Sequence, residues 1–197
     1  MQQHEIRVMP MRAFESDVHR EAAAVFVDGY YPELSFLSKD RETLIDAFRK
    51  IICADVFYVA TLDREIVGIL ACSDNRMRAM KIDPAIWRQA FGFVKGTISY
   101  AVMKGEFNRP LTYPDDTGYI ECVATAVSAR GKGVSTALFR HVLENARYRR
   151  YVLEVVDTNE TACRLYKKLG FAEIERKKER FSKLKGFHER IYMSFTK

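Results

Sequence analysis

The segment from residue 118 to residue 147 constrains the fold more than any other part of this sequence. Between Gly118 and Val127 the only charged residue is Glu121, a composition typical of a strand inside a sheet. Residues 128–133, Ser-Ala-Arg-Gly-Lys-Gly, form a turn. The helix expected after the turn carries an apolar stripe that consists of Val134, Ala137, Leu138, His141 and Val142. This strand–turn–helix unit predicts a sheet that is covered by helices.

The turn itself has the properties of an anion site. Gly131 and Gly133 allow backbone amides to approach a ligand closely, and the helix start adds free N–H groups and a positive dipole end. Arg130 and Lys132 contribute charge, so a pyrophosphate would suit the turn. A tight strand-to-helix connection explains the same residues equally well. The spacing matches neither a nucleotide P-loop nor a GxGxxG dinucleotide turn.

The chain before this unit divides into regular elements. We expect a strand, two helices and a hairpin of two strands at 5–11, 18–29, 44–52, 56–62 and 65–72. The first helix should end at Tyr30-Tyr31-Pro32, and Asp63-Arg64 should form the hairpin turn.

After the unit we expect a strand, a helix and two further strands, at 151–156, 160–169, 171–181 and 189–195. Asp157 should cap the helix with Glu160 as its partner, and Gly170 should follow the helix end. The order of elements predicts an α/β (α+β) fold in a single domain, residues 1–197, with a mixed sheet and helices on both faces.

Residues 74–117 form an excursion between two strands. Trp87, Phe91, Val94 and Ile98 follow a helical period, but Gly92 and Gly96 weaken the helix prediction, and prolines follow at 110 and 114. Trp87, Phe91 and Phe93 would be available as one wall of a binding site, and a packed helical insert would contain the same residues.

Composition narrows the class of protein. The formal net charge of +6 is a weak indication of an anionic ligand. The four cysteines (Cys53, Cys72, Cys122 and Cys163) are widely separated, so we expect reduced buried thiols and no metal site. No signal peptide or membrane-length apolar stretch is present, so we expect a cytoplasmic protein.

A second motif gives the turn its meaning. Residues 159–171 read N-x-x-A-x-x-L-Y-x-K-x-G-F, and Arg130-Gly131-Lys132-Gly133-Val134-Ser135 matches R/Q-x-x-G-x-G/A except at Ser135. With both motifs the chain resembles the GNAT superfamily of N-acetyltransferases over its whole length apart from the excursion. The resemblance implies a mostly antiparallel twisted sheet of six to seven strands. It also implies acetyl-CoA as cosubstrate and transfer of the acetyl group to a primary amine, by direct attack in a ternary complex.

The resemblance also assigns the donor site. The central strand should bulge and splay from its parallel neighbour, so that backbone groups of Val123, Ala124 and Thr125 pair with the pantetheine arm. The N–H near Val123 would stabilise the oxyanion. Asn159 would hold the cofactor arm, and the pyrophosphate would lie on the turn residues Arg130, Gly131, Lys132, Gly133, Val134 and Ser135.

Two side chains are candidate catalytic residues. Tyr166 would protonate the departing thiolate, because a thiol has a pKa of about 8.5 and a phenol about 10. Alternatively it is a core aromatic with a satisfied hydroxyl. Glu121 would deprotonate or bind the amine, or it would form a structural ion pair.

The acceptor is less well defined. Tyr30, Tyr31 and Glu33 lie where the family places an acceptor-binding loop, although a helix end contains the same residues. The acceptor could be a small polyamine, an amino sugar, an amino acid or a protein N-terminus. A homodimer is possible.

Two other functions remain open. The first is a non-catalytic acyl-CoA-binding sensor. The second is a basic nucleic-acid-binding domain, which would use the basic and aromatic residues of 175–190. Glu175, Glu179 and Glu189 interrupt that charge, which favours a solvated hairpin.

Overall fold

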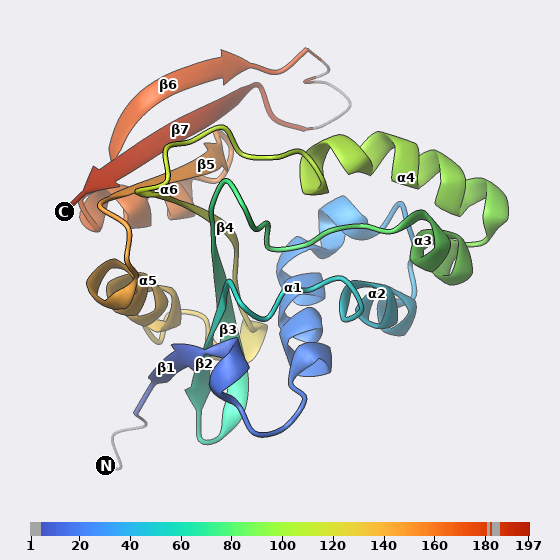
Figure 1. Ribbon diagram of the computed structural model, residues 1–197, viewed down its shortest axis with the longest axis horizontal. Coiled ribbons are helices and arrows are strands. Elements are labelled where there is room, and N and C mark those ends of the chain that lie inside the picture. Colours follow the sequence, from blue (N-terminus) through green and yellow to red (C-terminus); the bar gives the residue numbers. More distant parts are fainter. Residues whose placement is uncertain (1–4, 181, 183–185) are drawn as a thin grey trace.

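The computed structural model describes residues 5–180, 182 and 186–197 and contains a sheet of seven strands (Figure 1). The strands lie in the order β1-β2-β3-β4-β5-β7-β6. β4 and β5 are parallel, and the other neighbouring pairs are antiparallel. The strands are β1 (Arg7–Pro10), β2 (Phe57–Leu62), β3 (Glu65–Ser73), β4 (Thr117–Thr125), β5 (Arg150–Val156), β6 (Ala172–Lys178) and β7 (Glu189–Thr196). The predicted mixed, mostly antiparallel sheet is therefore confirmed.

Helices cover both faces of this sheet (Figure 1). They are α1 (His19–Leu34), α2 (Arg41–Phe48), α3 (Pro84–Phe91), α4 (Phe93–Phe107), α5 (Val134–Asn145) and α6 (Glu160–Lys168). Short 3-10 turns lie at Met11–Ala13 and Val127–Ala129. None of the described helices is long and apolar enough to cross a membrane.

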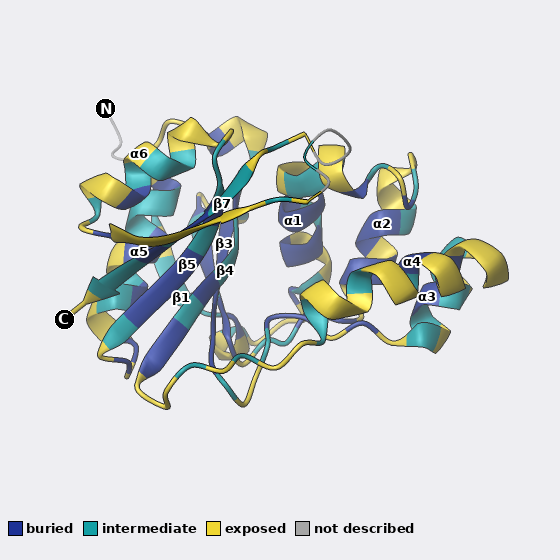
Figure 2. Cartoon of the chain, turned by 90° about the horizontal axis from the view of Figure 1, so that it is seen from above, coloured by how far each residue is buried: buried dark blue, intermediate teal, exposed yellow. Residues whose placement is uncertain are grey.

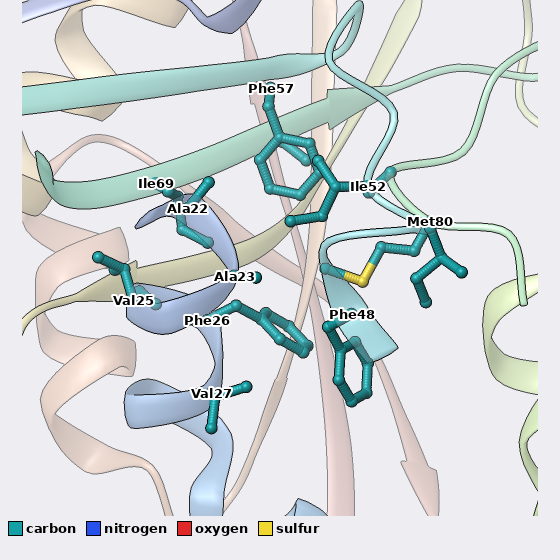
Figure 3. Packing of buried hydrophobic residues seen from close by; sticks show 14 of the residues in the cluster. Ala22, Ala23, Val25, Phe26, Val27, Phe48, Ile52, Phe57, Ile69 and Met80 are labelled. Carbon is teal, nitrogen blue, oxygen red and sulfur yellow. The ribbon is translucent and has the colours of Figure 1, made fainter. Parts of the chain in front are cut away.

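Two hydrophobic cores lie on opposite faces of the sheet. On one face α1, α2 and α3 pack against β2 and β3, and Figure 3 shows Phe26 and Phe48 at the centre of this core, with ring centroids 5.0 Å apart. On the other face α5 and α6 pack against the same sheet, with Phe139 and Tyr151 fully buried. Alternate residues of a strand point to opposite faces, so β3 contributes Ile69 to the first core and Leu70 to the second.

The hairpin turn was predicted correctly. Asp63 and Arg64 have φ angles of 52° and 70°, which is the backbone conformation that a two-residue type I′ connection requires. Asp and other small polar residues tolerate this conformation better than most, and the twist of the turn matches that of β2 and β3.

Several predicted helix boundaries were wrong. The first helix does not end at Tyr30: α1 is kinked there (φ −116°, ψ 15°) and continues to Leu34, because Pro32 lies in the first turn after the kink and needs no helical N–H partner. α2 ends at Phe48, and Ile52 instead forms a bridge with Met80. The cap of α6 is Asn159, because the Asp157 carboxylate accepts a hydrogen bond from the His188 backbone N–H.

The excursion contains two helices. Gly92 (φ 82°) separates α3 from α4, and Gly96 allows the two helices to cross closely, since a Cβ there would lie 2.6 Å from the Trp87 carbonyl oxygen. The outer side of α4 is exposed (Figure 2), so the apolar period did not indicate burial over its whole length. Four apolar side chains of α4 are between 62% and 75% exposed: Phe93, Val94, Ile98 and Val102.

The last predicted strand pair is shorter than expected at one end. β6 begins at Ala172 and ends at Lys178, so the strand predicted over 171–181 is too long, and Phe181, Lys183 and Lys185 lie outside the described residues. All seven residues of β6 are exposed, because it is the edge strand of the sheet.

Candidate active site

A β-bulge interrupts the central strand. Ile69 pairs with Ala124 and Ala71 pairs with Glu121, so Cys122 and Val123 together face one residue of β3. Cys122 has a φ of 54°, which is uncommon for a residue other than glycine. The bulge bends β4 at the position where the resemblance predicts it.

Directly after the bulge begins, β4 separates from β5. The parallel pairing runs from Thr117 opposite Arg150 to Ile120 opposite Leu153 and stops there. Within the described chain, the second half of β4 (121–125) has β3 on one side and no strand on the other. Backbone groups along this side of β4 are therefore available to pair with an extended ligand.

The open side of β4 leads to the glycine turn. Gly131 and Gly133 have φ angles of 77° and 87°, and a Cβ at either position would meet nothing within 4 Å. Glycine is required here by backbone conformation, and the space in front of the turn is open. Gly133 precedes α5 without a side-chain cap, so the first N–H groups of α5 point to this space. The Thr125 and Ser135 hydroxyls lie 2.9 Å apart and join the strand to the helix start.

Tyr166 lies on the buried side of α6. Its ring packs against Phe139 and Phe171, with centroids 5.2 and 6.3 Å away, and the side chain is 8% exposed. Its hydroxyl makes no hydrogen bond with the described residues. Burial raises the pKa of this hydroxyl above its usual value, so it is protonated throughout the neutral range.

Asn159 has a structural role in addition to the predicted one. Its side-chain oxygen accepts a hydrogen bond from the Ala162 N–H at 3.1 Å and caps α6. The amide nitrogen remains available for a ligand at the same helix start.

Glu121 is held by four hydrogen bonds. Its carboxylate accepts bonds from the Ser73 hydroxyl (2.5 Å), the Ala79 N–H (3.1 Å) and the Nε (3.1 Å) and Nη2 (2.8 Å) of Arg78. The Arg78 guanidinium also donates to the carbonyls of Arg109 (2.5 Å) and Glu106 (3.1 Å). Both charged side chains are mostly buried, at 16% and 17% exposure. Of the three roles open for Glu121, these contacts favour the ion pair, which fastens the end of α4 to the central strand.

The three candidate acceptor residues of the first helix do not converge. Tyr30 donates a hydrogen bond to the Val123 carbonyl at 3.3 Å, and burial raises its pKa. Tyr31 donates to the Lys39 carbonyl at 2.8 Å, while Glu33 is exposed. Tyr30 thus supports the bulge from the α1 side, a contact that the sequence pattern did not indicate.

A cavity of about 450 Å³ lies between the excursion and the strands β4, β5, β7 and β6. Tyr119 and Glu154 line it, and they flank the last residue pair before β4 and β5 separate. Its other strand residues include Arg190 and Tyr192, and the opposite wall is formed by residues 105–113. Sequence analysis missed these residues. Alternation of charged and aromatic residues in 189–195 was the available signal, but an exposed hairpin shows the same alternation.

Other parts of the chain were searched for alternative chemistry. The four cysteines are free; Cys72 is buried and the other three are only partly buried, which corrects the expectation that all are buried. No group of metal-ligating side chains occurs among the residues with described positions. In the 175–190 segment, Arg176 pairs with Glu173 and Glu189, and Lys177 with Glu175, as expected for a solvated hairpin.

Comparisons with known proteins agree with this geometry. The N-acetyltransferase from Staphylococcus aureus Mu50 has a TM-score of 0.62 at 18% identity, covering 96% of this chain and 100% of that one. Ard1 from Thermoplasma volcanium has a TM-score of 0.56 at 18% identity, covering 97% of each chain. The IAA acetyltransferase from Bacillus cereus has a TM-score of 0.54 at 14% identity, covering 99% and 100%. At these identities the likeness concerns the fold, and no curated protein matches the sequence.

The family assignment comes from the sequence. The model of the acetyltransferase (GNAT) family matches residues 17–171, which includes the bulged strand, the glycine turn and the helix with Tyr166. The match covers well over half of the chain, and so the protein belongs to the acetyltransferase (GNAT) family.

Proposed function

We propose that the protein transfers an acetyl group from acetyl-CoA to a primary amine by direct attack within a ternary complex. The observation that carries the proposal is the continuous path from the open edge of β4 to the open glycine turn. An extended arm can pair with the free edge of Val123–Thr125, and its pyrophosphate then meets the N–H groups at the start of α5.

The residues of the chain support the chemistry in two places. The N–H on the open side of the bulge, near Val123, would donate to the carbonyl oxygen as it gains negative charge. The amine nitrogen forms a bond to the thioester carbon, and the carbon–sulfur bond breaks. The attacking nitrogen loses a proton to solvent or to a nearby base. The departing thiolate takes a proton from the Tyr166 hydroxyl, which water then restores.

The raised pKa of Tyr166 affects this last step. A phenol that is a weaker acid than usual does not protonate a thiol of ordinary pKa before the bond breaks. Proton donation therefore has to accompany the cleavage of the carbon–sulfur bond.

Glu121 is not required as the base in this mechanism. Its four hydrogen bonds occupy the carboxylate, and it acts by holding Arg78 and the cavity wall in position.

Two measurements test the proposal. Calorimetry should detect binding of acetyl-CoA, and free CoA thiol should be released when an amine is added. Binding without release for any amine would indicate an acyl-CoA sensor, and absence of binding would exclude both functions.

A further inference from the structure

The cavity between the excursion and the C-terminal strands has a composition that selects among amines. Its floor is one face of the sheet, because Tyr119, Glu154, Tyr192 and Arg190 occupy alternate or paired positions on β4, β5 and β7. Its volume of about 450 Å³ suits a small molecule.

Carboxylates outnumber the cations available to them on this floor. The Arg190 guanidinium contacts Glu179 at 3.1 Å, Glu106 at 3.4 Å and also Glu154. Three carboxylates share one guanidinium, which leaves an excess of two negative charges. Arg78 does not balance them, because Glu121 takes up its charge. Glu154 and Glu179 are 19% and 12% exposed, so solvent screens them only partly.

Aromatic rings form the walls around these carboxylates. The rings of Tyr113 and Tyr119 are stacked at 5.8 Å, and the Tyr192 ring faces the Lys177 ammonium at 4.7 Å. Burial is the main cause that raises the pKa of the three tyrosine hydroxyls, and the charge of Glu154 raises each of them further. One negative charge is therefore felt on every side of the cavity.

Lys177 shows what such a surface accommodates. Its ammonium lies over an aromatic ring inside the cavity lining, and a carboxylate, Glu175, is 3.3 Å away. An alkylammonium of the chain itself thus occupies the environment that an external one would find.

We infer that this cavity binds the acceptor, and that the acceptor is an aliphatic amine with a second positive charge, such as a diamine or a lysine-like side chain. The inference rests on the proposed function. One nitrogen reacts at the gap between β4 and β5, and the other lies among Glu154, Glu106 and the tyrosines. Arg109, exposed on the opposite wall, is the feature that would favour a carboxylate-bearing acceptor instead.

Three acceptors of similar length and different charge test the inference: cadaverine, pentylamine and 5-aminovaleric acid. We expect kcat/KM for cadaverine to exceed that for pentylamine by roughly tenfold, and 5-aminovaleric acid to be the poorest. Equal rates for cadaverine and pentylamine, or a preference for the amino acid, would overturn the acceptor class and leave the proposed function intact. Failure to acetylate any amine while acetyl-CoA binds would overturn both.

Variants then locate the preference. Glu154→Gln should raise KM for cadaverine about tenfold, leave kcat and pentylamine nearly unchanged, and so abolish the preference. Glu106→Gln, at a carboxylate that is 65% exposed, should have a smaller effect in the same direction and serves if Glu154→Gln does not fold. Glu65→Gln, an exposed carboxylate at the β2–β3 turn, is the matched control. A preference that survives both cavity variants would contradict the inference.

Discussion

Cys122 carries the backbone conformation on which the donor site depends. Its φ of 54° creates the bulge, and the bulge directs the following residues away from β5. The sequence gives no sign of this, because glycine, asparagine and aspartate are the residues that usually indicate positive φ. Only the resemblance to a known family predicted a bulge in this strand, and the residue responsible had been interpreted as packing.

The role of Tyr166 can be tested with a single-atom change. Tyr166→Phe removes the proton donor and keeps the ring contacts with Phe139 and Phe171. We expect kcat to fall by about 10- to 100-fold, since water substitutes in part, and acetyl-CoA affinity to stay within about twofold. Tyr58→Phe, at a half-buried tyrosine on β2, is the control. Wild-type turnover at saturating acceptor would show that Tyr166 serves packing alone.

Glu121 should behave as part of an ion pair. Glu121→Gln leaves Arg78 without its charged partner in a mostly buried position, so we expect a loss of about 1–3 kcal/mol in the free energy of unfolding. KM for the amine should rise because the wall formed by Glu106 and Arg109 loosens, and the acidic limb of the pH–rate profile should not move. Disappearance of that limb, with stability unchanged, would identify Glu121 as the base.

Among the elements, the turn before α5 depends on backbone conformation and open space. Gly133→Asp brings a side chain and a negative charge to the predicted pyrophosphate position, so we expect acetyl-CoA affinity to fall at least about tenfold by calorimetry. Gly186→Asp is a matched control, because Gly186 also has a positive φ (75°) and open space around it. Equal affinity in wild type and Gly133→Asp would remove the turn from the site.

The two glycines of α4 should respond in opposite directions. A Cβ at Gly96 would lie 2.6 Å from the Trp87 carbonyl oxygen, whereas a Cβ at Gly105 would meet nothing within 4 Å. Gly96→Ala should therefore lower the free energy of unfolding by about 1–3 kcal/mol. Gly105→Ala should raise it by about 0.5–1 kcal/mol through helix propensity. Thermal unfolding of both variants measures the difference, and similar melting temperatures would contradict the close crossing of α3 and α4.

At the scale of the whole molecule, Asp74 joins segments that are far apart in sequence. Its buried carboxylate accepts hydrogen bonds from the Tyr148 hydroxyl and Arg147 beyond α5, and from the N–H groups of Arg76 and Met77. Burial alone would raise the pKa of Asp74, but these hydrogen bonds outweigh it and lower the pKa below its usual value.

A lowered carboxyl pKa stabilises the folded state above the unfolded pKa, near 4, and the stabilisation is lost as the pH falls further. Asp74→Asn should therefore be less stable than wild type at pH 7, and the difference should shrink below about pH 4. Melting temperatures of both proteins between pH 3 and pH 7 measure this effect. A difference that stays constant across the range would show that the charge of Asp74 contributes nothing.

The sequence predicted the strand order and the glycine turn because these depend on local periodicity and on two motifs. It did not predict the cavity, because Arg78, Glu154 and Arg190 meet only when the excursion folds over the C-terminal strands. The helix ends at Tyr30 and Phe48 were misplaced for a similar reason: Pro32 is tolerated after a kink, and Ile52 is buried by a bridge to Met80 and not by a helix.

The excursion separates two properties of the molecule along the chain. Residues 121–135 and 159–171 form the side that faces the donor, whereas residues 105–113 form a wall of the cavity and lie outside both motifs. Arg78 and Glu106 attach that wall to the sheet by two ion pairs, one to Glu121 and one to Arg190. Insertions or substitutions between these anchors can reshape the cavity without displacing the turn. Related chains that keep the anchors and differ only in this loop should share one donor and divide a range of acceptors among them.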